Sequence, residues 1–175
     1  MIERIRKAGF PALAWLSIAN YAAHYAEEAP RFVAWINSQG WKVSGSYTQK
    51  KFRTENALMF SFGVAATAQL SHRPEKRFLR MMALGSGVAY LQNTLFHALP
   101  TLRTGTYSPG LVTACLFNPP LAALLFWKAG QEGWLDTPTA LGAVALGTLV
   151  LPVFVGFTHK VLLADNTATT RCEAP

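Results

Sequence analysis

The sequence predicts an all-α fold, a polytopic membrane bundle of about five transmembrane helices with a short interfacial helix in the first loop. Apolar residues make up 51% of the 175 residues and charged residues only 14%, whereas an ordinary globular domain has roughly 25% charged residues. Five stretches are almost free of charge and close to the roughly 17–25 residues that a spanning helix needs. They cover residues 8–25, 56–71, 81–99, 107–127 and 137–158.

The first stretch follows a short basic N-terminus, as a secretory signal peptide would. It runs on into His24 and Glu27 rather than into a small-residue cleavage site, so we expect a retained first helix. Residues 29–54 form the longest connection. Within it, residues 30–36 are expected to form a short helix in the membrane interface, with Trp35 and Trp41 at the level of the lipid headgroups.

These stretches account for most of the chain and leave no room for a separate soluble domain. We therefore expect residues 1–164 to form a single transmembrane helical domain and residues 165–175 to form a polar, disordered tail. In the fourth stretch, Asn118-Pro119-Pro120 predicts a kink, because proline removes a helix hydrogen bond.

The net charge of +7 has an ordinary explanation in a membrane protein, where Lys and Arg flank the helices and meet anionic lipid. We expect the lipid bilayer as a partner and no nucleic acid. Basic residues divide evenly between the two predicted faces, so orientation and oligomeric state stay open. The compact basic loop at residues 73–80 favours a cytoplasmic N-terminus.

Polar residues gather where the predicted helices end on one face of the membrane. Ionisable groups within a membrane helix are costly and usually functional. In an up-and-down bundle this face collects His24, Glu27, Glu28, Glu55, Asn56, Asn93, His97, Tyr107, Thr113 and His159. His72 falls on the opposite face.

Two polar stripes at helical spacing strengthen this prediction. The first helix carries Ser17, Asn20 and His24 ahead of the two glutamates, and the third carries Ser86, Tyr90, Asn93 and His97. A polar stripe on a membrane helix normally faces the protein interior or a water-filled cavity. We expect the two stripes to face each other and to line a pocket open to one surface.

The polar cluster is typical of a site for a divalent transition metal, zinc or iron, with one or two ions. His24 and Glu28 lie one turn apart and can share a zinc ion, with His97 and His159 completing the ligands and Glu27 acting as general base. This arrangement slightly favours hydrolysis. Asn93 and Tyr107 are candidates to orient a ligand or stabilise negative charge.

The same residues also suit iron, because helical bundles bind two irons through glutamates and histidines. Glu55 is then an extra ligand and Asn56 a supporting residue. The alternatives are therefore a non-haem iron oxidoreductase and a non-enzymatic metal carrier or assembly protein.

The segment Tyr107-Ser-Pro109-Gly110 opens the fourth predicted helix and presents free backbone N–H groups, which form a candidate anion site. The expected substrate is amphiphilic or small and diffusible, bound with help from Gly110, Thr113 and Asn20.

Three motifs occur in order along the chain: His24-x-x-Glu27-Glu28, Asn93-x-x-x-His97 and Tyr107-x-Pro109-Gly110-x-x-Thr113. Together they resemble the HXXEE family of small bacterial membrane proteins, which is named for the first motif. The resemblance implies a multi-pass protein of the bacterial inner membrane, an enzyme whose site contains these motif residues. It implies no particular reaction.

Overall fold

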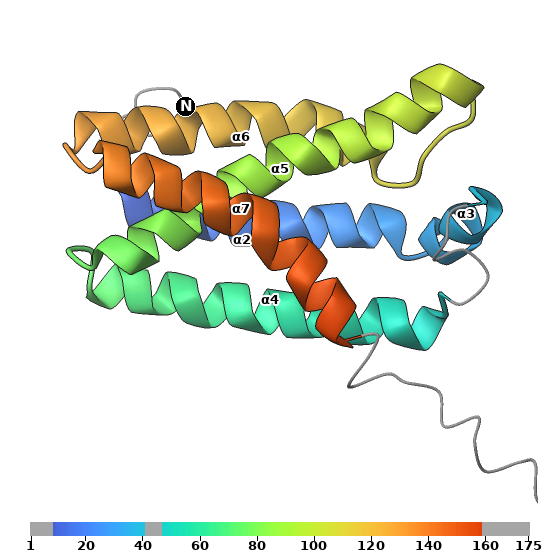
Figure 1. The fold of residues 1–175 in the computed structure, drawn as a ribbon, viewed down its shortest axis with the longest axis horizontal. Coiled ribbons are helices and arrows are strands. Elements are labelled where there is room, and N and C mark those ends of the chain that lie inside the picture. The colour runs from blue at the N-terminus through green and yellow to red at the C-terminus, as the bar shows by residue number, and fades with distance from the viewer. Residues whose placement is uncertain (1–8, 41–46, 159–175) are drawn as a thin grey trace, which may run out of the picture.

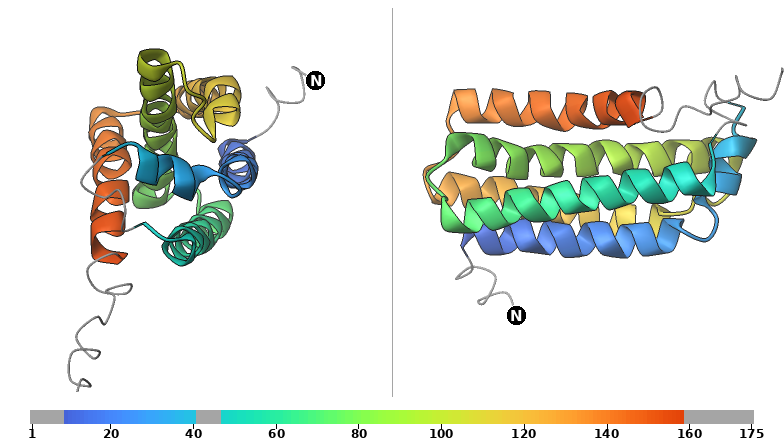
Figure 2. Two further views of the ribbon diagram at one scale, coloured as in Figure 1. Left: turned by 90° about the vertical axis from the view of Figure 1, so that its right-hand side faces the viewer. Right: turned by 90° about the horizontal axis from the view of Figure 1, so that it is seen from below.

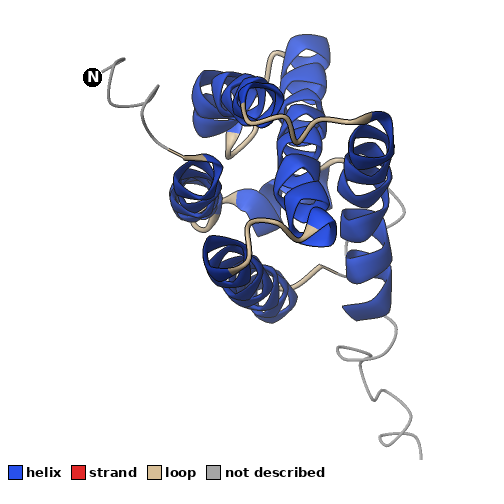
Figure 3. Cartoon of the chain, turned by 90° about the vertical axis from the view of Figure 1, so that its left-hand side faces the viewer, coloured by secondary structure: helices blue, strands red, loops and turns tan. Residues whose placement is uncertain are grey.

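The computed structural model describes residues 9–40 and 47–158, and in these ranges it contains helices and turns but no strand (Figure 3). The all-α prediction is therefore confirmed for the described residues. The helices are α2 (Phe10–Glu28), α3 (Phe32–Ser38), α4 (Gln49–His72), α5 (Arg77–Thr104), α6 (Leu111–Gln131) and α7 (Thr137–Phe157).

A long helix lies over each of the five apolar stretches, and α2, α4, α5 and α6 extend past them into polar sequence. Helix α6 begins later than predicted, at Leu111 instead of Tyr107, because Gly110 precedes it in a left-handed conformation at φ +97°. Pro119 and Pro120 lie inside α6, which continues to Gln131. The predicted tail at residues 165–175 lies outside the described residues.

The long helices run side by side, with α3 at one end of the bundle (Figures 1 and 2). Helix α5 packs against α6, α7 and α4, while α2 packs against α6 and α4. The contact between α5 and α7 is close, because a Cβ atom on Gly147 would lie 2.4 Å from the backbone oxygen of Gly85. Small residues commonly allow helices to approach in this way in membranes.

The apolar core occupies the end of the bundle away from α3. It combines the first turns of α2, α5 and α7 with the last turns of α4 and α6, through buried Phe10, Leu70, Leu84, Leu125 and Ala143. The opposite end, where α2 and α5 finish, contains the buried polar residues of the two predicted stripes.

Among the described helices, α6 and α7 are both long enough and apolar enough to cross a membrane. Helices α2, α4 and α5 have sufficient length, with 19, 24 and 28 residues, but carry more polar residues. Two such helices are a weak indication of a membrane protein, and the five-span topology stays a prediction.

The expected short helix in the first loop is present as α3, and the side chain of Trp35 on this helix points into the protein. It is buried against α5, with its ring centroid 5.7 Å from that of Phe96 and 6.1 Å from that of His97. Aromatic partners on α5 bury its ring, and its depth in a membrane stays a prediction. Trp41 lies outside the described residues.

Candidate metal site

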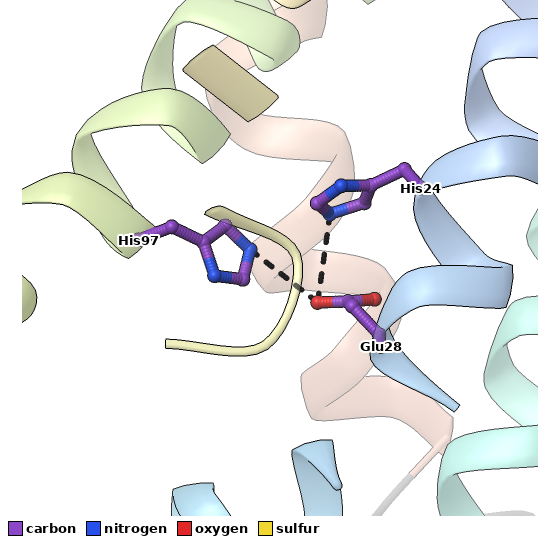
Figure 4. Close-up of side chains that lie close together, drawn as sticks. All are labelled: His24, Glu28 and His97. Carbon is purple, nitrogen blue, oxygen red and sulfur yellow. Dashed lines mark ion pairs between the residues drawn. The ribbon is translucent and has the colours of Figure 1, made fainter. Parts of the chain in front are cut away.

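Three buried side chains from two helices converge near α3. His24 and Glu28 lie one turn apart at the end of α2, and His97 reaches them from α5 (Figure 4). One potential ligand atom from each residue lies within 4.8 Å of the other two. Oε1 of Glu28 is 3.5 Å from Nε2 of His24 and 3.3 Å from Nε2 of His97. An imidazole pair and a carboxylate are thus directed toward one point.

The hydrogen bonds around His24 fix which ring nitrogen faces this point. Its Nδ1 lies 2.8 Å from the hydroxyl oxygen of Thr113, and that hydroxyl donates to the backbone oxygen of Gly110 at 3.2 Å. Because the hydroxyl proton is used there, the oxygen of Thr113 accepts a hydrogen bond from Nδ1 of His24. Nε2 is buried and faces Oε1 of Glu28 at 3.5 Å.

His97 has a similar arrangement. Its Nδ1 lies 2.8 Å from the hydroxyl oxygen of Ser108, and its side chain is fully buried. Histidines that bind metals almost always use the second ring nitrogen in a hydrogen bond that fixes ring orientation. Both rings therefore have the outer support that a metal ligand requires, supplied by residues on either side of Gly110.

Gly110 brings the turn before α6 directly against the three side chains. A Cβ atom at this position would lie 2.7 Å from Cε1 of His24, 2.9 Å from Cε1 of His97 and 3.0 Å from Cγ of Glu28. Its φ of +97° is also one that residues with a side chain rarely adopt. The site therefore requires glycine here for both space and backbone conformation.

Glu28 is ionised in this environment. Burial raises the pKa of its carboxyl, but the hydrogen bonds and charge interactions with His24 and His97 outweigh that effect and leave the pKa below its ordinary value. An ionised carboxylate is the form that binds a metal cation.

Glu27 points away from this cluster to the first turn of α6. Its carboxylate accepts hydrogen bonds from the backbone N–H groups of Val112 and Thr113, at 3.0 and 2.8 Å, and from the hydroxyl of Tyr107. Partial burial opposes ionisation, but the hydrogen bonds from Thr113, Tyr107 and Val112 lower the pKa of Glu27 to about 2. A carboxylate with this pKa is a weak base near neutral pH.

The contacts of Glu27 also correct the predicted anion site. The N–H groups of Val112 and Thr113, which were expected to receive a substrate headgroup, already bind the carboxylate of Glu27. Tyr107 is half exposed, and partial burial together with its hydrogen bond to Glu27 raises its pKa to about 12. It therefore stays a neutral donor at physiological pH.

Asn20 and Asn93 belong to a buried network around Asn118. The amide nitrogen of Asn20 donates to the side-chain oxygen of Asn118 at 2.8 Å. The amide nitrogen of Asn118 in turn donates to the side-chain oxygen of Asn93 at 3.1 Å. The amide nitrogen of Asn93 lies 3.3 Å from Nε2 of His97. The network therefore ends at the metal-binding candidates.

The remaining predicted residues are separate from the three-residue cluster. Glu55 accepts hydrogen bonds from Tyr47, at 2.5 Å, and Thr158, at 2.9 Å. Asn56 accepts one from Tyr21 at 2.7 Å. His159 lies outside the described residues.

The two polar stripes meet as the sequence predicts. The hydroxyl of Tyr90 donates to the backbone oxygen of Ser17 at 2.5 Å, and His97 pairs with Glu28. Sequence reasoning did not identify Ser108 or the bridging role of Asn118. A polar residue inside an otherwise apolar helix was the available signal for Asn118, but the adjacent prolines directed attention to a kink.

The match to known families covers most of this site. Residues 15–125 match the family model described as "Protein of unknown function with HXXEE motif", so the chain belongs to the HXXEE family. His24, Glu27 and Glu28 form that motif here. Searches of curated proteins and of solved structures give no match.

Proposed function

We propose that this HXXEE-family protein is an integral membrane metalloenzyme that holds one divalent transition metal ion near one membrane face. Nε2 of His24, Nε2 of His97 and the carboxylate of Glu28 are the proposed ligands. The observation that carries the proposal is the convergence of three buried ligand atoms within 4.8 Å. A cation between them would offset the cost of burying an ionised carboxylate between two imidazole rings.

Exposed apolar side chains support a membrane location. Large apolar groups project outward along α5 and along α6 and α7, which both pack against α5. Soluble monomers rarely expose continuous apolar surfaces of this kind. The exposed residues on these helices include Leu91, Leu95, Leu99, Leu116, Phe117, Leu141, Val144, Leu149, Val153 and Phe157.

Hydrolysis is the reaction that we favour. Two histidines and one glutamate are a known ligand set for catalytic zinc, which leaves a position for water. A zinc ion held by these residues would lower the pKa of a bound water to about 7, so the reaction would need no separate protein base. We therefore transfer Glu27 from the role of general base to that of a residue that holds the α6 turn.

The ligand set also gives a specific reason to retain iron chemistry as the second candidate. Two histidines and one carboxylate with open positions form the site of non-haem iron oxygenases. A metal carrier is less well supported, because the buried ligands and their hydroxyl anchors favour a resident ion over one that must leave.

The test is metal removal and replacement in the detergent-solubilised protein. After chelation, zinc or ferrous iron is added, and cleavage of a para-nitrophenyl fatty-acid ester and oxygen uptake are measured. We expect zinc to restore ester cleavage in the native protein. Oxygen uptake with iron alone would overturn hydrolysis in favour of the second candidate, and failure to bind either ion would contradict both.

A matched pair of histidine variants controls this test. His97→Ala removes a proposed ligand, whereas His72→Ala changes an exposed histidine at the other end of the bundle. His97→Ala should lose metal-dependent cleavage, and His72→Ala should retain it. Equal activity in the two variants would contradict the proposed site.

A further inference from the structure

Every proposed ligand of the metal site is covered by protein. His97 is fully buried, and His24 and Glu28 are each only 7% exposed. Nε2 of His24, the atom that faces Glu28, is itself buried. An ion or a substrate can therefore reach this point only when a covering element moves.

The long helices and the turn before α6 are firmly held. Helices α2 and α5 carry the ligands and also contribute to the apolar core at the other end of the bundle. In the turn, the backbone N–H of Ser108 donates to the hydroxyl of Thr101 at 3.2 Å. The hydroxyl of Ser108 is hydrogen-bonded to His97, and the hydroxyl of Tyr107 donates to Glu27. Movement of the turn would break these hydrogen bonds.

Helix α3 covers the site through the faces of its aromatic rings. It lies across the end of the bundle, in front of the long helices in the left view of Figure 2. The ring of Trp35 stacks on that of His97, with centroids 6.1 Å apart and 29° between the planes. The ring of Phe32 lies 6.3 Å from His97 and stacks on Phe52 of α4 at 5.2 Å. Such contacts come from burial rather than from directional bonds.

The length and the attachment of α3 suit an element that moves. It has seven residues, fewer than the roughly 12–15 at which an isolated helix becomes marginally stable, so its position depends on packing. The turn at residues 29–31 joins it to the end of α2, where the backbone N–H of Arg31 donates to the backbone oxygen of Glu28 at 3.1 Å. A few residues at the end of an element are sufficient as a hinge.

We propose that the entrance to the metal site lies under α3, and that α3 is a lid that leaves His97 to admit the ion and the substrate. The inference rests on the proposed metal site, although opening of the lid is a property of the metal-free protein. Trp35 holds the lid closed, because its ring stacks on a proposed ligand. Loss of this ring should shift α3 toward the open position.

The first test is the rate of zinc exchange between the detergent-solubilised protein and a fluorescent zinc indicator. Trp35→Ala should raise the rates of uptake and release at least about tenfold, because both depend on the open fraction and the variant loses a large buried ring. The zinc affinity should stay within about threefold of the native value, since none of the proposed ligands is on α3. Faster release with unchanged uptake would show that Trp35 only holds His97 in place, and would overturn the lid.

Two tryptophan variants control this test. Trp35→Phe keeps a ring over His97 and should exchange zinc at nearly the native rate. Trp127→Ala removes an exposed ring at the other end of the bundle and should have no effect. Trp35→Leu replaces Trp35→Ala if the alanine variant does not fold, with the same expected direction. Equal acceleration in Trp127→Ala would contradict the proposal.

A thiol at the site tests the opening without any metal. Ser108→Cys is made in a chain with Cys115 and Cys172 replaced by serine. It places the thiol beside His97, at a position with no exposed surface. Trp35→Ala should raise the rate of maleimide labelling at this thiol at least about tenfold.

A variant of the turn before α6 tests the competing entrance. Tyr107→Phe loosens this turn, because it removes the hydroxyl that donates to Glu27. It should leave the labelling rate close to that of the parent chain. Acceleration by Tyr107→Phe and not by Trp35→Ala would place the entrance at the turn and overturn the proposal.

The two measurements separate this inference from the proposed function. Labelling that depends on Trp35 in a protein that binds no zinc would support the lid and overturn the metal site. Zinc binding with uptake and labelling rates that ignore Trp35→Ala would do the opposite.

Discussion

The two ends of the bundle treat polar residues in opposite ways. Near α3, His24, Glu28 and His97 turn inward and are buried. At the other end, charged groups lie around an apolar core: Arg77 pairs with Asp136 at 2.9 Å, and the guanidinium of Arg80 lies 4.8 Å from the ring centre of Trp134. The apolar end is a conventional helix-bundle core, whereas the polar end buries the side chains of the candidate metal site.

The caps of α6 and α7 make the same contrast. Asp136 caps α7 from the adjacent residue, by accepting from the backbone N–H of Thr139 at 2.9 Å. Glu27 reaches the first turn of α6 from a different helix, 86 residues away from Thr113 in the sequence. A local cap stabilises one helix, while the long-range cap also fixes the turn that contacts the ligands. The turn beside the candidate metal site is therefore held by a contact between two helices, whereas the start of α7 is held by a local cap.

The largest expected difference is that the two ends of the bundle lie on opposite faces of the membrane. Helix α5 connects the two ends and has 28 residues, about 42 Å at the usual rise per residue. With Cys115 and Cys172 replaced by serine, Glu75→Cys and Thr106→Cys should react with an impermeant maleimide from opposite faces of sealed vesicles. Labelling of both from one face would show that α5 does not cross the membrane.

The next effect is on the free energy of unfolding. Gly110 and Gly133 both have positive φ, but a Cβ atom contacts the ligands at Gly110 and nothing within 4 Å at Gly133. Gly133→Ala should cost about 1–2 kcal/mol from backbone strain alone. Gly110→Ala adds overpacking and should cost about 2–5 kcal/mol. Denaturant titration in micelles measures both, and equal costs would refute the close contact at the site.

A smaller effect is expected at Glu27. Glu27→Gln should cost about 1 kcal/mol, typical of a lost helix cap. Because the pKa of Glu27 falls from 4.5 to about 2 on folding, the ionised carboxylate stabilises the fold above about pH 4.5 and loses this effect as the pH falls toward 2. The stability difference between native protein and variant should shrink over that interval. A constant difference would contradict the proposed contacts of Glu27.

Asp136→Asn sharpens the comparison of the two caps. It changes a cap at the end without the site, so zinc affinity should stay at the native value. Glu27→Gln should weaken zinc binding about 10-fold, as changes around metal ligands do. Zinc titration of the two variants would reveal whether the long-range cap supports the ligands.

The sequence predicted the long helices and the meeting of His24, Glu28 and His97, because both follow from periodicity and the alternating direction of helices. It did not predict the contacts of Glu27, since spacing places Glu27 and Glu28 together while only packing shows that they face different partners. Asn118 was missed for a similar reason. Its role depends on the side chains that α2 and α5 present to it.

X-ray absorption by the zinc-loaded protein tests the central proposal most directly. The account predicts one zinc ion per chain, nitrogen and oxygen neighbours at about 2.0–2.2 Å, and scattering from two imidazoles that falls to one in His97→Ala and stays at two in His72→Ala. Zinc without imidazole neighbours, or an identical spectrum for His97→Ala and the native protein, would contradict it.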